Sequence, residues 1–173
     1  MGNDEFRFEL LTENDLPSLT EWLGRPHVAE HWGSPPAIAK VREKYISRLR
    51  PNSAVTPYVA WLGDRPVGYI QSYVAARCGN GWWADVADAG VVGIDQFLAD
   101  EESLGQGLGS ALVAAFVQKL FADPTVGRVQ TDPSPANKRA IRCYEKAGFR
   151  EVGLVDTPAG EALLMVVERP ESC

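Results

Sequence analysis

The sequence predicts a single α/β (α+β) domain built on a mixed sheet. Strand and helix patterns alternate along the 173 residues, and no repeat, low-complexity segment or linker divides them. A chain of this length is large enough for one sizeable core. We therefore expect one domain over residues 1–173, with about seven strands and about four helices.

The first half of the chain starts with a strand signal and continues with two helix signals and a hairpin. Apolar and charged residues alternate at the start, and apolar residues at helical spacing follow a capping-box signal at 12–15. The segment RPHVAEHWGSPP (25–36) is interpreted as a loop closed by prolines. The expected elements are a strand at 6–10, helices at 16–23 and 38–49, and hairpin strands at 55–62 and 67–75 joined by a turn at 63–66.

Residues 91–109, VVGIDQFLADEESLGQGLG, organise the second half of the chain. An apolar strand carries one carboxylate, Asp95, and leads through an acidic turn into a loop with glycines at 105, 107 and 109. Glycines let backbone approach a ligand closely, and the N-terminus of the following helix offers N–H groups to an anion. The stretch therefore predicts a phosphate-bearing cofactor beside an acid/base centre.

The remaining segments complete the predicted sheet. A loop at 77–90 carries paired tryptophans, Trp82 and Trp83. Ser134 as N-cap and Pro135 at the first helical position predict the start of a helix that ends at Gly148. The other expected elements are a helix over 110–121 and strands at 127–131, 150–156 and 161–168.

The composition limits the classes of partner that we expect the protein to bind. The net charge of −6 disfavours a nucleic-acid surface and suits a cationic ligand. Three cysteines without metal-type spacing, no apolar run of membrane length and no leader pattern in MGNDEFRFE predict a cytoplasmic protein with no membrane partner and no metal. A monomer is favoured over a homodimer.

Two motifs carry a resemblance to a known family. The loop Leu104-Gly-Gln-Gly-Leu-Gly109 follows the expected fourth strand, and Asn137-x-x-Ala-x-x-x-Tyr144-x-x-x-Gly-Phe lies on the last helix. Together they resemble the GCN5-related N-acetyltransferase (GNAT) superfamily, although Leu104 stands where Arg or Gln is usual. The resemblance implies the GNAT fold, a mixed and mostly antiparallel sheet, and acetyl-CoA as co-substrate.

Further segments are similar to the aminoglycoside 6′-N-acetyltransferases, which act on kanamycin- and tobramycin-like drugs and confer resistance to them. The loop around HWGSPP is shorter than is usual in that family, and Asn80 and Ala159 stand where relatives carry Asp. These departures bear on the substrate range. The matching segments are GWW (81–83), GIDQ (93–96), QTDPSP (130–135) and NKRAIRCYEKAGF (137–149).

The resemblance also implies roles for individual residues. Asp95 is expected to be the general base and Tyr144 the acid that protonates the departing thiolate, whereas Asp132 would hold substrate ammonium groups. The expected cofactor-binding residues are Gln96, Phe97, Leu98, Leu104, Gly105, Gln106, Gly107, Leu108, Gly109 and Asn137. The expected substrate-binding residues are Trp32, Tyr73, Asn80, Trp82, Trp83, Asp95 and Asp132.

Each role has a structural alternative. Asp95 could be paired structurally, Asp132 could be an ordinary turn residue, and Tyr144 could serve packing alone. One of the paired tryptophans is expected to fill the core. Cys143 is expected to pack in its helix, so that transfer is direct within a ternary complex.

Two other functions stay open from the sequence. The first is acetylation of another amine, such as a polyamine, a lysine-like siderophore precursor or a protein N-terminus, because this fold hosts many substrates. The second is a non-catalytic domain that binds acyl-CoA.

Overall fold

The computed structural model describes residues 5–33 and 37–171. Three sequence predictions concern residues outside this part of the chain. They are the start of the N-terminal segment (1–4), the middle of the HWGSPP loop (34–36) and Cys173.

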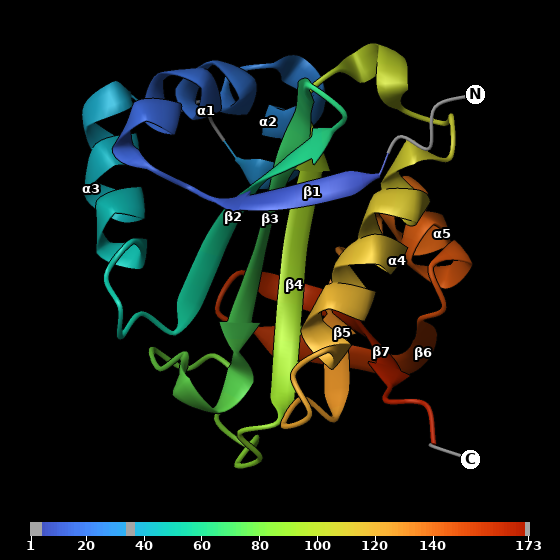
Figure 1. Ribbon diagram of the computed structural model, residues 1–173. Coiled ribbons are helices and arrows are strands. Elements are labelled where there is room, and N and C mark those ends of the chain that lie inside the picture. Colours follow the sequence, from blue (N-terminus) through green and yellow to red (C-terminus); the bar gives the residue numbers. More distant parts are fainter. Residues whose placement is uncertain (1–4, 34–36, 172–173) are drawn as a thin grey trace. The chain divides into compact units, whose positions relative to one another are not determined.

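The described part of the chain forms seven strands and five α-helices in the expected α/β arrangement (Figure 1). The strands form one mixed sheet in the order β1-β2-β3-β4-β5-β7-β6. The strands β4 and β5 pair in parallel, whereas β1–β2, β5–β7 and β6–β7 are antiparallel. The bounds are β1 (Phe6–Leu10), α1 (Leu16–Leu23), α2 (Pro26–Trp32), α3 (Ile38–Arg48), β2 (Val55–Leu62), β3 (Arg65–Val74), β4 (Val91–Leu98), α4 (Leu108–Phe121), β5 (Arg128–Thr131), α5 (Lys138–Lys146), β6 (Arg150–Thr157) and β7 (Gly160–Glu168).

The structure has one α-helix more than the expected four. This additional helix is α2, which lies in the segment whose sequence predicts a loop. Pro26 occupies its first position, where a proline has no N–H to lose and its fixed φ suits a helix. Gly33 ends the helix with φ of 93°. The prolines at both ends of the segment signal a loop, but the seven residues between Arg25 and Gly33 are helical.

The helix α5 starts later than expected. Its N-cap is Asn137, not Ser134, because the Asn137 Oδ1 accepts a hydrogen bond from the Ala140 N–H at 3.2 Å. Ser134 instead stabilises the preceding turn, where its Oγ accepts from the Ala136 N–H at 3.3 Å.

Contacts divide the chain into two compact units. The first unit is Met1–Gln71 with Gln96–Leu104, and the second unit is Ser72–Asp95 with Gly105–Cys173. The strands β3 and β4 contribute residues to both units.

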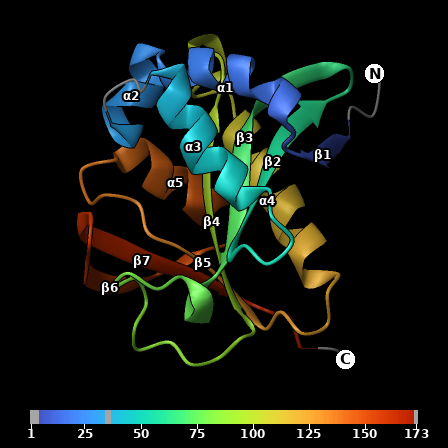
Figure 2. The ribbon, with the colours of Figure 1, turned by 90° about the vertical axis from the view of Figure 1, so that its left-hand side faces the viewer.

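The first unit buries its core between three helices and the strands. The helices α1, α2 and α3 lie together on one side of β2 and β3 (Figures 1 and 2). Aromatic rings dominate this core: Tyr69 stacks on Phe97 at 5.5 Å between ring centroids, and Tyr45 and Trp22 meet this pair edge-on.

The second unit contains the helices α4 and α5 and the hairpin β6–β7. The hairpin register runs from Arg150↔Val166 to Thr157↔Gly160. Its strand β7 pairs with β5, which in turn pairs with β4, so the second unit places the middle of β4 beside the end of β5. No helix within the described residues is long and apolar enough to cross a membrane.

Candidate active site

Two carboxylates of the second unit lie on neighbouring strands. Asp95 lies in the middle of β4 and Asp132 directly follows β5. The parallel register from Val91↔Arg128 to Gly93↔Gln130, continued by two residues, places Asp132 level with Asp95. Both side chains are half-buried. Burial, and then the negative charge of Asp95, raise the pKa of Asp132 from 3.8 to about 7. This pair can therefore take up or release a proton near neutral pH.

Tyr73 of β3 lies beside both carboxylates. It is 5% exposed, and burial followed by the charges of Asp95 and Asp132 raises its pKa well above 10.0. The Gln130 Nε2 donates a hydrogen bond to the Tyr73 hydroxyl at 3.4 Å. Tyr73 is thus a neutral phenol, and its O–H can donate toward a negative neighbour.

Gly93 makes room for the Tyr73 ring. A Cβ added at Gly93 would lie 1.9 Å from the Tyr73 Cζ, so the ring passes directly over the backbone of β4. The Tyr73 ring also stacks on Trp83, with 6.4 Å between centroids and 7° between planes. Trp82 lies 6.1 Å from Trp83. The three rings form an aromatic wall, which we define as Tyr73, Trp82 and Trp83.

The loop that carries the two tryptophans has unusual backbone. Asn80 and Trp83 have φ of 55° and 52°, in the left-handed region that non-glycine residues seldom adopt. Both tryptophans are half-buried and Asn80 is exposed. The expectation that one of the tryptophans fills the core is therefore wrong, because both are held in the loop next to Tyr73 and remain partly open to solvent.

Trp32 belongs to the first unit. Its ring meets Tyr69 and Phe97 edge-on at 5.9 and 5.0 Å. It also borders a cavity of about 640 Å³ along α3, together with Tyr45 and Lys40. The structure thus gives Trp32 a packing role, and its expected contact with substrate stays a prediction.

The part of β4 after Asp95 belongs to the first unit. Phe97 and Leu98 are each 6% exposed, so their side chains are buried. The Gln96 Oε1 is buried and has no hydrogen-bond partner among the described residues. A buried acceptor of this kind is unfavourable unless a ligand supplies a donor.

The glycine loop adopts the conformation that its sequence predicts. Gly105 and Gly107 have φ of 73° and 81°, and a Cβ at either position would meet no atom within 4 Å. Gly107 is the N-cap of α4 and offers no side-chain acceptor. The first N–H groups of α4 therefore have neither an intrahelical acceptor nor a side-chain cap, and they can bind an anion. Leu104 precedes the loop, and its N–H donates to the Glu101 carbonyl at 3.0 Å.

The helix α5 presents Asn137 and Tyr144. Asn137 uses its amide oxygen as the helix cap, which leaves the amide N–H₂ for a ligand. Tyr144 is 4% exposed and meets Phe149 edge-on at 5.5 Å. Burial raises the pKa of Cys143 to about 11, so its thiol is a weak nucleophile at neutral pH.

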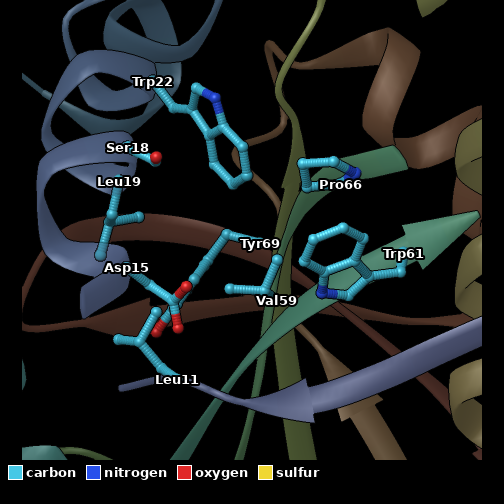
Figure 3. A pocket seen from close by; sticks show the side chains of 9 residues that line it. All are labelled: Leu11, Asp15, Ser18, Leu19, Trp22, Val59, Trp61, Pro66 and Tyr69. Carbon is cyan, nitrogen blue, oxygen red and sulfur yellow. The ribbon is translucent and has the colours of Figure 1, made fainter. Parts of the chain in front are cut away.

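Other features lie apart from the expected site residues. A cavity of about 100 Å³ in the first unit lies between α1 and the β2–β3 strands, with Asp15 and Ser18 among otherwise apolar and aromatic side chains (Figure 3). None of the expected site residues lines it. Within the described residues, no group of three or more His, Cys, Asp or Glu side chains could hold a metal ion.

Sequence reasoning missed Gly93 and Gln130 as supports of Tyr73. Both lie inside the GIDQ and QTDPSP segments, but their partner is on a strand that is distant in sequence.

The family follows from comparison with known proteins. The family model described as "Acetyltransferase (GNAT) domain" matches residues 12–157. The aminoglycoside N(6′)-acetyltransferase type 1 of Klebsiella pneumoniae is 52% identical over 171 residues, which cover 97% of this chain and 85% of that protein. The chain belongs to the aminoglycoside 6′-N-acetyltransferases of the GNAT superfamily. The sequence resemblance is thereby confirmed.

Solved structures of this family match the whole fold. The structure of AAC(6′)-Ib with Parmomycin and acetyl-CoA is 53% identical with a TM-score of 0.92, and covers 96% of this chain and 94% of that one. The crystal structure of AAC(6′)-Ib with coenzyme A and kanamycin is 52% identical with a TM-score of 0.91, and covers 95% of each chain. The GNAT fold is therefore confirmed.

Proposed function

We propose that this 6′-N-acetyltransferase transfers the acetyl group of acetyl-CoA to the 6′-amine of aminoglycosides, directly and within a ternary complex. The observation that carries the proposal is the pair Asp95 and Asp132, which sits beside the aromatic wall in a member of this family. The same chemistry confers resistance, because the acetylated amine loses its positive charge.

The carboxylate pair suits a cationic sugar. An ammonium group that approaches the pair stabilises the ionised form of Asp132 and lowers its pKa from about 7. Asp132 then holds substrate ammonium groups while Asp95 accepts a proton from the 6′-ammonium, directly or through water. The aromatic wall offers π faces to the remaining ammonium groups and to the apolar faces of the sugar ring.

The freed amine attacks the thioester carbonyl carbon. The new C–N bond forms as the C–S bond breaks, and backbone N–H groups of β4 after Asp95 stabilise the developing negative charge on the oxygen. Tyr144 donates a proton to the departing thiolate and regains it from the nitrogen that becomes the amide. One proton is released in the whole reaction, because a cationic ammonium becomes a neutral amide.

Acetyl-CoA can bind to hydrogen-bond donors of the glycine loop and of α5. The N–H groups of the loop 105–109 and of the start of α4 can hold a pyrophosphate, since no atom lies within 4 Å of a Cβ built at Gly105 or Gly107. The Asn137 amide N–H₂ can donate to the pantetheine arm, because its amide oxygen is already used as the helix cap. The high pKa of Cys143 supports direct transfer over an acyl-enzyme.

Acetyl-CoA is a metabolite of the cytoplasm, so we place the reaction there. We also propose that residues 1–173 act as a single catalytic domain and that the protein is a monomer.

A panel of amines tests the proposal. The purified protein is incubated with acetyl-CoA and either kanamycin, an aminoglycoside with a 6′-hydroxyl in place of the amine, spermidine or lysine, and thiol release is measured. We expect turnover with kanamycin and none with the 6′-hydroxyl compound. Turnover with spermidine or lysine alone would overturn the proposal in favour of another amine.

A further inference from the structure

Two side chains from the start of α2 bind the end of β4. The Arg25 Nη1 donates to the Ala99 carbonyl oxygen at 2.6 Å and to the Asp100 Oδ1 at 2.8 Å. The His27 Nε2 lies 2.9 Å from the Leu98 carbonyl oxygen, and because a carbonyl only accepts, this nitrogen carries the proton. We call Arg25 and His27 the α2 clamp.

The same strand end is also packed against β3. The Ala99 N–H donates to the Val67 carbonyl at 2.9 Å. A Cβ at Gly68 would lie 2.3 Å from the Phe97 carbonyl oxygen, so β3 and β4 approach very closely here. The last residues of β4 are thus fixed both by β3 and by the α2 clamp.

The clamp differs from an ordinary surface ion pair. Salt bridges between exposed side chains contribute little, and the Arg25–Glu21 bridge at 2.8 Å, with Glu21 68% exposed, belongs to that class. The contacts to Leu98 and Ala99 instead bind backbone carbonyls at the end of Gln96–Leu98, the segment that is expected to meet the cofactor. The bonds of the Arg25 guanidinium are charge-assisted, and such hydrogen bonds are stronger and more directional than neutral ones.

We propose that Arg25 and His27 are positioning residues for acetyl-CoA. By fixing the carbonyls of Leu98 and Ala99, they set the position of the Gln96–Leu98 backbone that meets the pantetheine arm. This inference rests on the proposed cofactor site and not on the identity of the amine. Neither residue touches the reacting atoms, so the clamp acts on cofactor affinity and leaves amine binding unchanged.

The test compares variants that remove the α2 clamp with a variant that removes only the exposed Arg25–Glu21 salt bridge. Arg25→Ala and His27→Ala delete the bonds to the strand, and Arg25→Lys and His27→Gln keep a donor at each position. Glu21→Ala is the matched control, because it breaks the exposed bridge and leaves both bonds of Arg25 to the strand in place. Binding of acetyl-CoA is measured by calorimetry with no amine present, and the KM of each substrate is measured with kanamycin.

We expect Arg25→Ala to weaken acetyl-CoA binding about tenfold, because the loss of charge-assisted hydrogen bonds leaves the strand end less ordered. His27→Ala has a smaller effect in the same direction. Arg25→Lys and His27→Gln restore most of the affinity, Glu21→Ala stays within about twofold, and the KM for kanamycin is unchanged in all of them.

Unchanged acetyl-CoA affinity in Arg25→Ala would overturn the inference, as would an equal rise in both KM values. If Arg25→Ala does not fold, the same comparison is made with Asp100→Asn, which weakens one bond of the clamp and must still reduce acetyl-CoA binding more than Glu21→Ala does. Calorimetry without an amine separates this inference from the proposed function, because wild-type binding of acetyl-CoA with no turnover of kanamycin would refute only the latter.

Discussion

Asp132→Asn should stabilise the protein while it impairs amine binding. The substitution keeps the shape of the side chain and removes its ability to ionise. Burial and the charge of Asp95 raise the pKa of Asp132 from 3.8 to about 7, so the folded protein resists the ionised form that the unfolded chain readily adopts.

The sign and the size follow from this difference. Below pH 3.8 the Asp132 carboxyl is protonated in both the folded and the unfolded state, so its ionisation does not change the stability. Between pH 3.8 and about 7 the unfolded chain binds fewer protons than the folded one, so stability falls as the pH rises, and above about pH 7 the loss is complete. At about 1.4 kcal/mol for each pKa unit the loss approaches about 4 kcal/mol, which is an upper bound because water screens a half-buried group.

The assay is urea unfolding of the wild type and Asp132→Asn at pH 5, 7 and 8. We expect the variant to gain on the order of 1–4 kcal/mol at pH 8 and progressively less toward pH 5. Asp85→Asn serves as control, because Asp85 is exposed and its neutralisation should change stability by no more than about 0.5 kcal/mol. An advantage of Asp132→Asn that does not depend on pH, or a loss of stability at pH 8, would refute the reasoning.

Three further predictions concern the same site. For kanamycin, kcat/KM at saturating acetyl-CoA should rise with pH through about 7 as Asp132 ionises, and Asp132→Asn should lose this step; a wild-type profile without an inflection near 7 would contradict the assignment. Gly93→Ala should destabilise the protein by about 1–3 kcal/mol and raise the KM for kanamycin, because the added Cβ would lie 1.9 Å from the Tyr73 ring. Gly127→Ala is the control and should be nearly neutral, because a Cβ there has no atom within 4 Å; equal effects of the two variants would argue against the Tyr73 clash as the cause. Gly107→Val should raise the KM for acetyl-CoA much more than the KM for kanamycin, since φ of 81° disfavours a β-branched residue and the new side chain would occupy the open space beside Gly107. Equal changes in both KM values would refute the assignment of the loop to acetyl-CoA.

Much of the fold could be predicted because local pattern and tertiary packing agree. The hairpin strands, the strand that carries Asp95 and the amphipathic helix α4 all follow their apolar periods. The helix α2 escaped prediction because prolines flank it, and Asn137 replaced Ser134 as the cap of α5 because the turn after Pro133 extends further than its sequence indicates. In both places turn residues and helix signals overlap, and packing decides between them.

The candidate site was predicted less completely. The carboxylates and the glycine loop carry their own signals, since an acid in an apolar strand and glycines before a helix are unusual in themselves. The supports of the site carry no such signal. That the Tyr73 ring lies over Gly93, or that Arg25 reaches the Ala99 carbonyl, depends on residues distant in sequence, which only the folded chain brings together.

The most direct test of the proposed mechanism is the behaviour of Asp95→Asn, because this one side chain is the proton acceptor in that mechanism. Turnover of kanamycin is measured under saturating conditions, and binding of acetyl-CoA is measured by calorimetry. We expect kcat to fall by about 10²–10⁴-fold, the usual contribution of a general base, while acetyl-CoA affinity stays within about twofold. A variant that retains kcat within about threefold of the wild type would contradict the mechanism.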